Sequence, residues 1–226
     1  MTHPASRNSL FQSLLQLAPG LLSDCARVSL KAGPWPAELA EDDGCLYFPE
    51  DSLWGLSTSS GAPQGVRLAL LGCHHVWSPK RARSSGLRAE VLVPGQALRV
   101  SESLVRAAGA RTATWWLQEA ASAQALLAQM ARMVFCAQHH DAAQSLASWL
   151  LLAQQHSPSA ALRLPERPWR AWLAWTPEVW QSAWDTLESQ QAVNLVRLEE
   201  GNVMALKALA PLSTLACPCH QAPPRD

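Results

Sequence analysis

One stretch near the middle of the chain, residues 116–134, combines high helix propensity with a narrow apolar stripe. Ala and Gln fill much of it, and neither Gly nor Pro interrupts residues 112–156. Apolar or small residues recur at alternating spacings of four and three, which keeps them on one side of a helix. A stripe this narrow is typical of a seam between two helices, whereas an ordinary buried helix, the alternative here, has a wider apolar face. The predicted dimer-interface residues are Trp116, Ala120, Ala123, Leu127, Met130 and Val134.

The segment before this helix has a different pattern of apolar residues. Between about residues 25 and 100, short apolar runs are cut by Gly and Pro, which predicts short strands in a small antiparallel barrel or roll. A short helix is expected on either side of the strands, at residues 9–22 and 101–108. The strands themselves are expected at residues 28–30, 45–48, 53–56, 66–71, 89–93 and 97–100.

The segment after the long helix has the order of a winged helix-turn-helix. Asp141 can cap a helix that runs to about residue 155, and a short helix is expected at residues 168–175. Thr176-Pro177-Glu178 then provides a cap, a first-position proline and an acidic first turn for a helix to about residue 190. Two short strands, 195–198 and 203–206, form a hairpin. Helix, turn, helix and hairpin follow one another as in winged DNA-binding domains.

Net charge and hydropathy limit the classes of partner that the chain is expected to bind. Lys plus Arg and Asp plus Glu number 18 each, so no net charge attracts the chain to nucleic acid or to an anionic membrane. The sequence has no apolar run of about 18 residues that could span a membrane. Residues 1–10 have no signal-peptide pattern. We therefore expect a cytoplasmic protein without membrane contact.

The six cysteines are expected to be thiols in that compartment. Only Cys217-Pro218-Cys219-His220 is clustered in the sequence, and it could hold a metal ion or form a redox pair. A structural zinc site needs four ligands, and this cluster offers three without a clear fourth. We therefore predict no metal site and no cofactor.

Tryptophan is unusually frequent, with eleven residues, six of them between residues 149 and 184. Their helical spacing favours core packing, because each ring buries a large apolar area. The alternative is an exposed apolar patch that binds another protein.

Several segments together resemble the Crp/Fnr transcription regulators, and in particular the branch whose sensor domain has diverged from cyclic-nucleotide binding. They occur in the order and near the spacing of that family, over roughly residues 8–220. The segments are Leu46-Tyr47-Phe48-Pro49, Ala69-Leu70-Leu71-Gly72, Val93-Pro94-Gly95-Gln96-Ala97-Leu98-Arg99, residues 140–151 and Cys217-Pro218-Cys219.

The resemblance implies an α+β fold with an N-terminal antiparallel β-roll (cupin-like), a long central dimerisation helix and a C-terminal winged helix-turn-helix. It implies a cyclic-nucleotide-binding-like sensor at residues 1–110, the dimerisation helix at 111–137 and the winged helix-turn-helix-like domain at 138–226. The implied assembly is a homodimer.

The sensor segment departs from the family pattern. Cyclic-nucleotide binding in the family uses a Gly-Glu pair followed by an Arg that neutralises the phosphate, but residues 72–77 contain no glutamate. Adjacent His74 and His75 are expected to point apart and to be surface residues rather than a pH sensor or metal site. The basic run at residues 80–85 is expected to be a solvated loop, so no cyclic nucleotide is expected and the effector is unknown or absent. The basic residues near the segment are Lys80, Arg81, Arg83 and Arg88.

The expected recognition helix departs from the pattern too. It carries no cation, and Glu178 and Asp185 would be repelled by phosphates. Gln181 and Ser182 remain as base or phosphate contacts. Since the part of the chain from residue 151 has six basic and seven acidic residues, DNA binding is expected to be weak. The backbone contacts available are Arg163, Arg167, Arg170 and Arg197, whose alternative role is surface charge near Glu166 and Glu199.

These observations predict a dimeric DNA-binding transcription regulator of Crp/Fnr type with a degenerate effector pocket. The alternative is a DNA-binding-deficient relative that acts as a protein-interaction or heterodimerisation module, with a protein partner or a paralogue. An enzyme is not expected, because the sequence has no nucleophile elbow, no phosphate-binding loop and no acid/base pair at a useful spacing.

Overall fold

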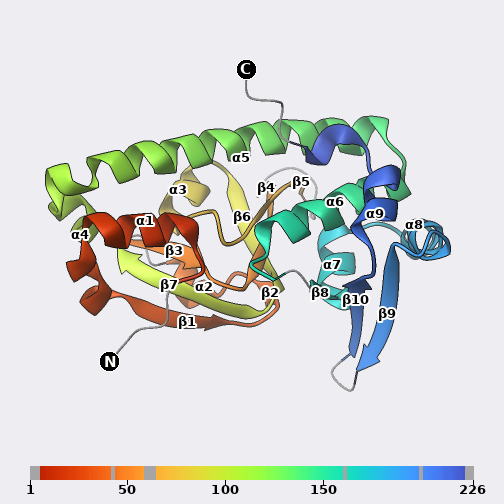
Figure 1. Ribbon diagram of the computed structural model, residues 1–226, viewed down its shortest axis with the longest axis horizontal. Helices are drawn as coiled ribbons and strands as arrows, with labels where there is room; N and C mark the ends of the chain where they lie inside the picture. The colour runs from red at the N-terminus through yellow and green to blue at the C-terminus, as the bar shows by residue number, and fades with distance from the viewer. Residues whose placement is uncertain (1–5, 42–43, 59–64, 160–161, 199–200, 222–226) are drawn as a thin grey trace.

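The computed structural model describes residues 6–41, 44–58, 65–159, 162–198 and 201–221, and one long helix spans it (Figure 1). This helix, α5 (Ala113–His139), has 27 residues and runs past a β-roll and then past a winged-helix unit. It ends where His140 adopts an extended backbone conformation. The predicted long central helix is confirmed. None of the helices in the described ranges is long and apolar enough to cross a membrane.

The β-roll consists of two antiparallel sheets. Strands β6 and β7 are consecutive along the chain but lie in different sheets, and only Pro94 separates them. All six predicted strands are present. Strand β2 was not predicted, because two residues that include a proline leave no alternating pattern. One sheet has the order β1 (Ala26–Leu30), β7 (Gly95–Ser101), β3 (Cys45–Pro49), and the other β2 (Gly33–Pro34), β6 (Leu87–Val93), β4 (Leu53–Thr58), β5 (Arg67–Leu71).

Short helices close the roll, and buried hydrogen bonds anchor them. The Asn8 side chain caps the first helix by accepting from the amide of Phe11, and its amide donates to the carbonyls of Pro49 and His75. The Trp115 indole donates to the carbonyl of Leu10, which ties α5 to this helix. The helices are α1 (Ser9–Leu17), η1 (Pro19–Asp24), α2 (Ala37–Ala40), α3 (Pro79–Ser84), α4 (Glu102–Ala107) and η2 (Gly109–Thr112).

The solvated loop predicted at residues 80–85 is wrong, because this segment forms α3. Ser78 caps that helix by accepting from the amide of Arg81, and Pro79 occupies its first position. Serine followed by proline is a recognised helix start, so the sequence carried the signal.

The winged-helix unit has the predicted order of elements. Asp141 and Gln144 form a capping box for its first helix, and Thr176 caps the second helix of the helix-turn-helix. Strand β8 and helix α9 were not predicted. The elements are α6 (Ala142–His156), β8 (Arg163–Pro165), α7 (Glu166–Leu173), α8 (Pro177–Ser189), β9 (Val193–Leu198), β10 (Gly201–Leu206), α9 (Leu209–Leu215) and η3 (Pro218–His220), with sheet order β8-β10-β9.

One hydrophobic core joins the winged-helix unit to the β-roll. Leu53, Leu70 and Leu92 of the roll belong to the same buried cluster as Trp149 and Trp172. A Cβ added at Gly55 of β4 would overlap the Trp172 indole, so glycine permits this close approach. The two units of this chain therefore pack directly on each other.

The tryptophans between residues 149 and 184 fill this core. Five of them are buried, and Trp175 is partly buried. The predicted alternative of an exposed tryptophan patch is therefore wrong. The indole rings pack inside the core, as their helical spacing indicated.

Candidate functional site

Helix α5 has one face against its own chain and one face open. Trp115, Gln129 and Met133 are buried on the inner face. On the outer face Leu117 is 72% exposed and Leu127 is 65% exposed. Large aliphatic side chains with this much exposure on a long helix are typical of a surface that another helix covers.

The predicted interface residues divide between the two faces. Ala120, Ala123 and Leu127 are exposed on the outer face, while Val134 is half-buried. Trp116 and Met130 are half-buried and pack against the β-roll of their own chain, so they offer a partner less surface than the exposed residues do. The guanidinium groups of Arg81 and Arg106 lie 5.6 and 4.7 Å from the Trp116 ring. The open apolar ridge comprises Leu117, Ala120, Leu127, Ala131 and Phe135.

Aromatic side chains occupy the core of the β-roll. The Trp35 ring lies 5.4 Å from Tyr47, 4.7 Å from Trp54 and 6.3 Å from Trp77, measured between centroids. Arg81 of α3 forms ion pairs with Glu102 at 3.0 Å and Glu119 at 2.8 Å. Its guanidinium is thus already neutralised by two carboxylates of its own chain.

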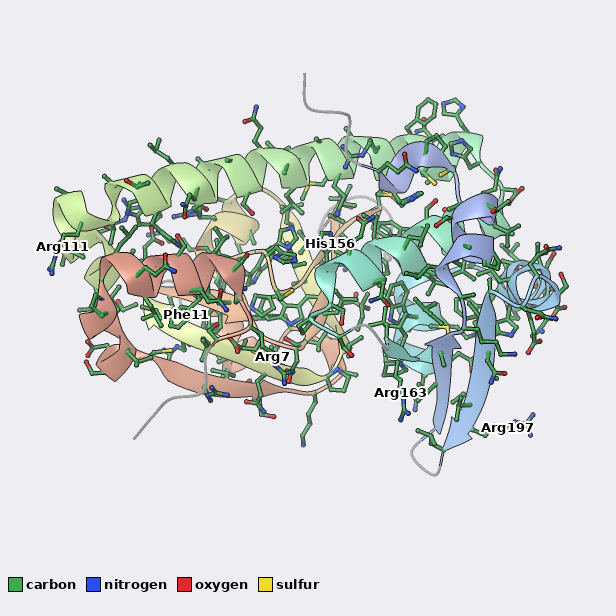
Figure 2. The ribbon with its side chains drawn as sticks, viewed as in Figure 1. Arg7, Phe11, Arg111, His156, Arg163 and Arg197 are labelled. Carbon is green, nitrogen blue, oxygen red and sulfur yellow. The ribbon has the colours of Figure 1, made fainter. Side chains whose placement is uncertain are left out.

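His74 and His75 point apart, as predicted, but only His74 is a surface residue. His75 is buried and accepts a hydrogen bond at Nδ1 from the amide of Gly72 at 3.2 Å. The ring of His75 packs edge to face against the ring of His156, the last residue of α6, with 4.6 Å between the ring centroids. Figure 2 shows His156 between the β-roll and the winged-helix unit. The prediction that both histidines lie on the surface is wrong for His75.

Gln129 of α5 connects this histidine pair to the sheet. Its Oε1 accepts from the amide of Leu70 at 3.0 Å, which fixes the orientation of the side-chain amide. Its Nε2 therefore donates to Nε2 of His156 at 2.8 Å, and that nitrogen is unprotonated. Burial lowers the pKa of His75 to about 4, and burial also lowers the pKa of His156 well below its usual value. The β-roll, α5 and α6 thus meet at a neutral, buried polar contact that no sequence pattern indicated.

The outer face of α8 is polar and acidic. Gln181 and Ser182, the predicted base-contacting residues, are exposed there with Glu178 and Asp185. The Gln181 amide donates to the Asp185 carboxylate at 2.7 Å. This face is therefore accessible to a partner, but α8 itself contributes negative charge and no cation, and the neighbouring arginine is Arg170 of α7.

The predicted backbone-contacting arginines are all exposed, and none of them belongs to α8. Arg163 on β8 and Arg197 on β9 lie on the lower right side of the molecule in Figure 2, with the wing. Arg167 and Arg170 come from α7, and Arg170 pairs with Glu166 at 3.2 Å. Within the described ranges, Arg163, Arg167 and Arg197 have no ion pair with a carboxylate.

The C-terminal Cys-Pro-Cys segment does not stand alone. Cys217 and Cys219 lie beside Cys136 and His140, and the potential ligand atoms of these four residues all lie within 4.8 Å of one another. In the sequence, His220 stands as the third potential ligand of this cluster, with no clear fourth. His220 is instead turned to the Cys217 carbonyl, at 2.7 Å from its Nδ1.

No protein-family model and no curated protein matches this sequence. Solved structures do match it. FixK2 from Bradyrhizobium japonicum is 16% identical, with a TM-score of 0.56 over 85% of this chain and 98% of that chain. A CooA variant from Carboxydothermus hydrogenoformans is 14% identical, with a TM-score of 0.56 over 86% and 89%.

A transcriptional regulator of the CRP family from Thermus thermophilus is 17% identical, with a TM-score of 0.54 over 84% of this chain and 95% of that chain. These similarities extend over the roll, the long helix and the winged-helix unit together. The chain therefore shares the fold of these structures, as its sequence segments predicted.

Proposed function

We propose that this protein is a homodimeric, DNA-binding transcription regulator of Crp/Fnr type, acting in the cytoplasm and not as an enzyme. The observation that carries the proposal is the combination of two exposed surfaces on one fold. The outer ridge of α5 is apolar and open, and the polar face of α8 is open while the tryptophans behind it are packed. Two copies joined along α5 present two α8 helices, as dimeric helix-turn-helix regulators do.

In this proposal the first residues of α8 enter the major groove. Gln181 and Ser182 contact base edges, which requires Gln181 to exchange its bond to Asp185 for a base. Arg163, Arg167 and Arg197 contact phosphates beside the groove. Arg170 contributes less, because Glu166 already neutralises part of its charge.

The charge distribution sets the strength of binding. Three arginines per subunit without a carboxylate partner in the described ranges make six phosphate contacts per dimer, and such a dimer should show a slope of about −5 for log K against log salt. Glu178 and Asp185 oppose this attraction on the recognition face itself. We therefore propose weak non-specific binding that high salt abolishes.

The sensor roll serves as a structural unit without a cyclic-nucleotide pocket. The aromatic cluster of Trp35, Tyr47, Trp54 and Trp77 fills its core, and Arg81 is held by two carboxylates. A cyclic phosphate needs an unpaired cation and clustered donors, which Arg81 does not offer. The degenerate pocket is thus part of the proposal.

The acidic face of α8 favours a second candidate, a DNA-binding-deficient module that pairs with a paralogue or another protein. A salt titration with mixed-sequence duplex DNA, measured by fluorescence anisotropy on the full chain, separates the two. The first candidate predicts binding near 50 mM salt that weakens steeply as salt rises. No binding there would overturn it and leave the second.

A double variant, Arg163→Gln with Arg197→Gln, tests the assigned phosphate contacts. The double variant removes four cations per dimer, so the slope of log K against log salt should become shallower by about 4. Arg111→Gln is the matched control, because Arg111 is exposed at the opposite end of α5 (Figure 2). A control variant that weakens binding as much as the double variant would contradict the placement of DNA.

A further inference from the structure

Four potential metal ligands converge where α5 gives way to α6. Cys136 lies in the last turn of α5, and His140 follows one helical turn later. Cys217 and Cys219 arrive from the other side, at the start and the middle of η3. Cys136, Cys217 and Cys219 are buried and His140 is half-buried, so solvent has little access to the cluster.

The distances fit a tetrahedral ion. Zinc bonds of about 2.3 Å to sulfur and about 2.0 Å to nitrogen place neighbouring ligand atoms about 3.5 to 3.8 Å apart. Sγ of Cys136 lies 3.3 Å from Sγ of Cys217, and Sγ of Cys219 lies 3.6 Å from Nδ1 of His140. All four ligand atoms lie within 4.8 Å of one another. Movements of less than about 1 Å would complete the tetrahedron, and the Cys136–Cys217 sulfur pair is too far apart for a disulfide.

Neighbouring residues support the two cysteines of η3. Oγ of Ser148 lies 3.0 Å from Sγ of Cys217, and Arg132 Nε donates to the Cys219 carbonyl at 3.1 Å. His220 holds the turn at the Cys217 carbonyl, which explains why it is not itself part of the set. Groups that orient ligands in this way accompany structural metal sites.

We propose that Cys136, His140, Cys217 and Cys219 bind one Zn²⁺ ion in a closed structural site. Three sulfur ligands and one imidazole match the soft donor set that zinc prefers. Each thiol loses its proton to solvent as it coordinates, and no oxidant or reductant takes part. The ion fastens the C-terminal segment to the junction between the helix proposed to dimerise and the winged-helix unit. The site does not depend on DNA binding.

The test uses the full chain, purified without chelator, and measures metal content after gel filtration. The expected result is one zinc per chain. After zinc removal, Co²⁺ alone should give the visible bands of a tetrahedral ion and a near-ultraviolet thiolate charge-transfer band, and Zn²⁺ should displace it. No retained zinc and no tetrahedral Co²⁺ spectrum would overturn the proposal, as would a Cys136–Cys217 disulfide in protein that binds neither ion after reduction.

Two pairs of variants identify the ligands. Cys217→Ser and His140→Asn should each lose the bound zinc or weaken its retention at least tenfold, and the Co²⁺ spectrum should lose one sulfur or one nitrogen contribution. Cys73→Ser and His139→Asn are matched controls and should keep one zinc per chain, because Cys73 and His139 lie outside the cluster. If His220→Asn removed the ion and His140→Asn did not, the assigned set would be wrong. Should a ligand variant fail to fold, the Co²⁺ spectrum of the unaltered protein still decides.

Discussion

The open ridge of α5 leads to a quantitative prediction about Leu127. Burying a leucine side chain fully stabilises an assembly by about 1.5–3 kcal/mol. Leu127 is 65% exposed in the isolated chain, so covering it contributes about 1–2 kcal/mol per copy and about 2–4 kcal/mol per dimer. Leu127→Glu removes this contribution and sets two carboxylates against each other. Since about 1.4 kcal/mol changes a dissociation constant tenfold, the dissociation constant of the dimer should rise about 30-fold to 700-fold.

Sedimentation velocity over a range of concentrations measures this change directly. Met130→Glu is the informative comparison, because Met130 packs on the β-roll of its own chain. At concentrations too low for dimers to form, Met130→Glu should lower the thermal unfolding temperature, whereas Leu127→Glu should leave that temperature nearly unchanged. Leu209→Glu, an exposed leucine on α9, controls for loss of surface leucine. A Leu127→Glu protein that dimerises as tightly as the unaltered chain would refute the interface.

Three further predictions concern stability. Gly55→Ala should destabilise the fold by about 1–3 kcal/mol in urea unfolding, because its Cβ overlaps the Trp172 indole, whereas Gly20→Ala has open space and should be neutral. His75 has a pKa of about 4 when folded against about 6.5 unfolded, so the unfolded state binds more protons between these values. His75 alone should therefore make stability fall by about 2 kcal/mol from about pH 7 towards pH 5, and buried His156, whose pKa is also lowered, should add to this fall. His75→Gln should reduce the fall, and a flat profile would contradict the burial of neutral histidine. Removing zinc with a chelator should lower the unfolding temperature by several degrees, and the Cys217→Ser protein should show no such response.

The sequence predicted most elements because their signals are local. Asp141 and Thr176 carry the caps that begin α6 and α8, and the short apolar runs that form the roll strands lie between Gly and Pro breaks. Which face of α5 packs on the roll could be predicted only in part. The predicted stripe and the open ridge share Ala120 and Leu127 but diverge at Met130 and Ala131, and only the packed roll determines that Met130 faces inward.

The candidate sites also depend on contacts between distant segments, which the sequence alone does not reveal. The contact of Gln129, His75 and His156 joins residues far apart in the sequence, so no local pattern could indicate it. Part of the metal cluster could have been predicted from the sequence. Cys136 and His140 are four residues apart at the end of the long helix, a short spacing that suits two ligands of one ion. What the sequence could not provide was the return of Cys217 and Cys219 to that helix end.

Selection of bound duplexes from a random-sequence library tests the central proposal most directly. Two α8 helices related by a dimer axis along α5 should enrich an inverted repeat with half-site centres about 10 base pairs, or one helical turn, apart. Substitution of Gln181 or Ser182 should alter the half-site, while Arg111→Gln should leave it unchanged. Enrichment of no sequence by a protein that is dimeric in solution would contradict the account of this chain as a DNA-binding regulator.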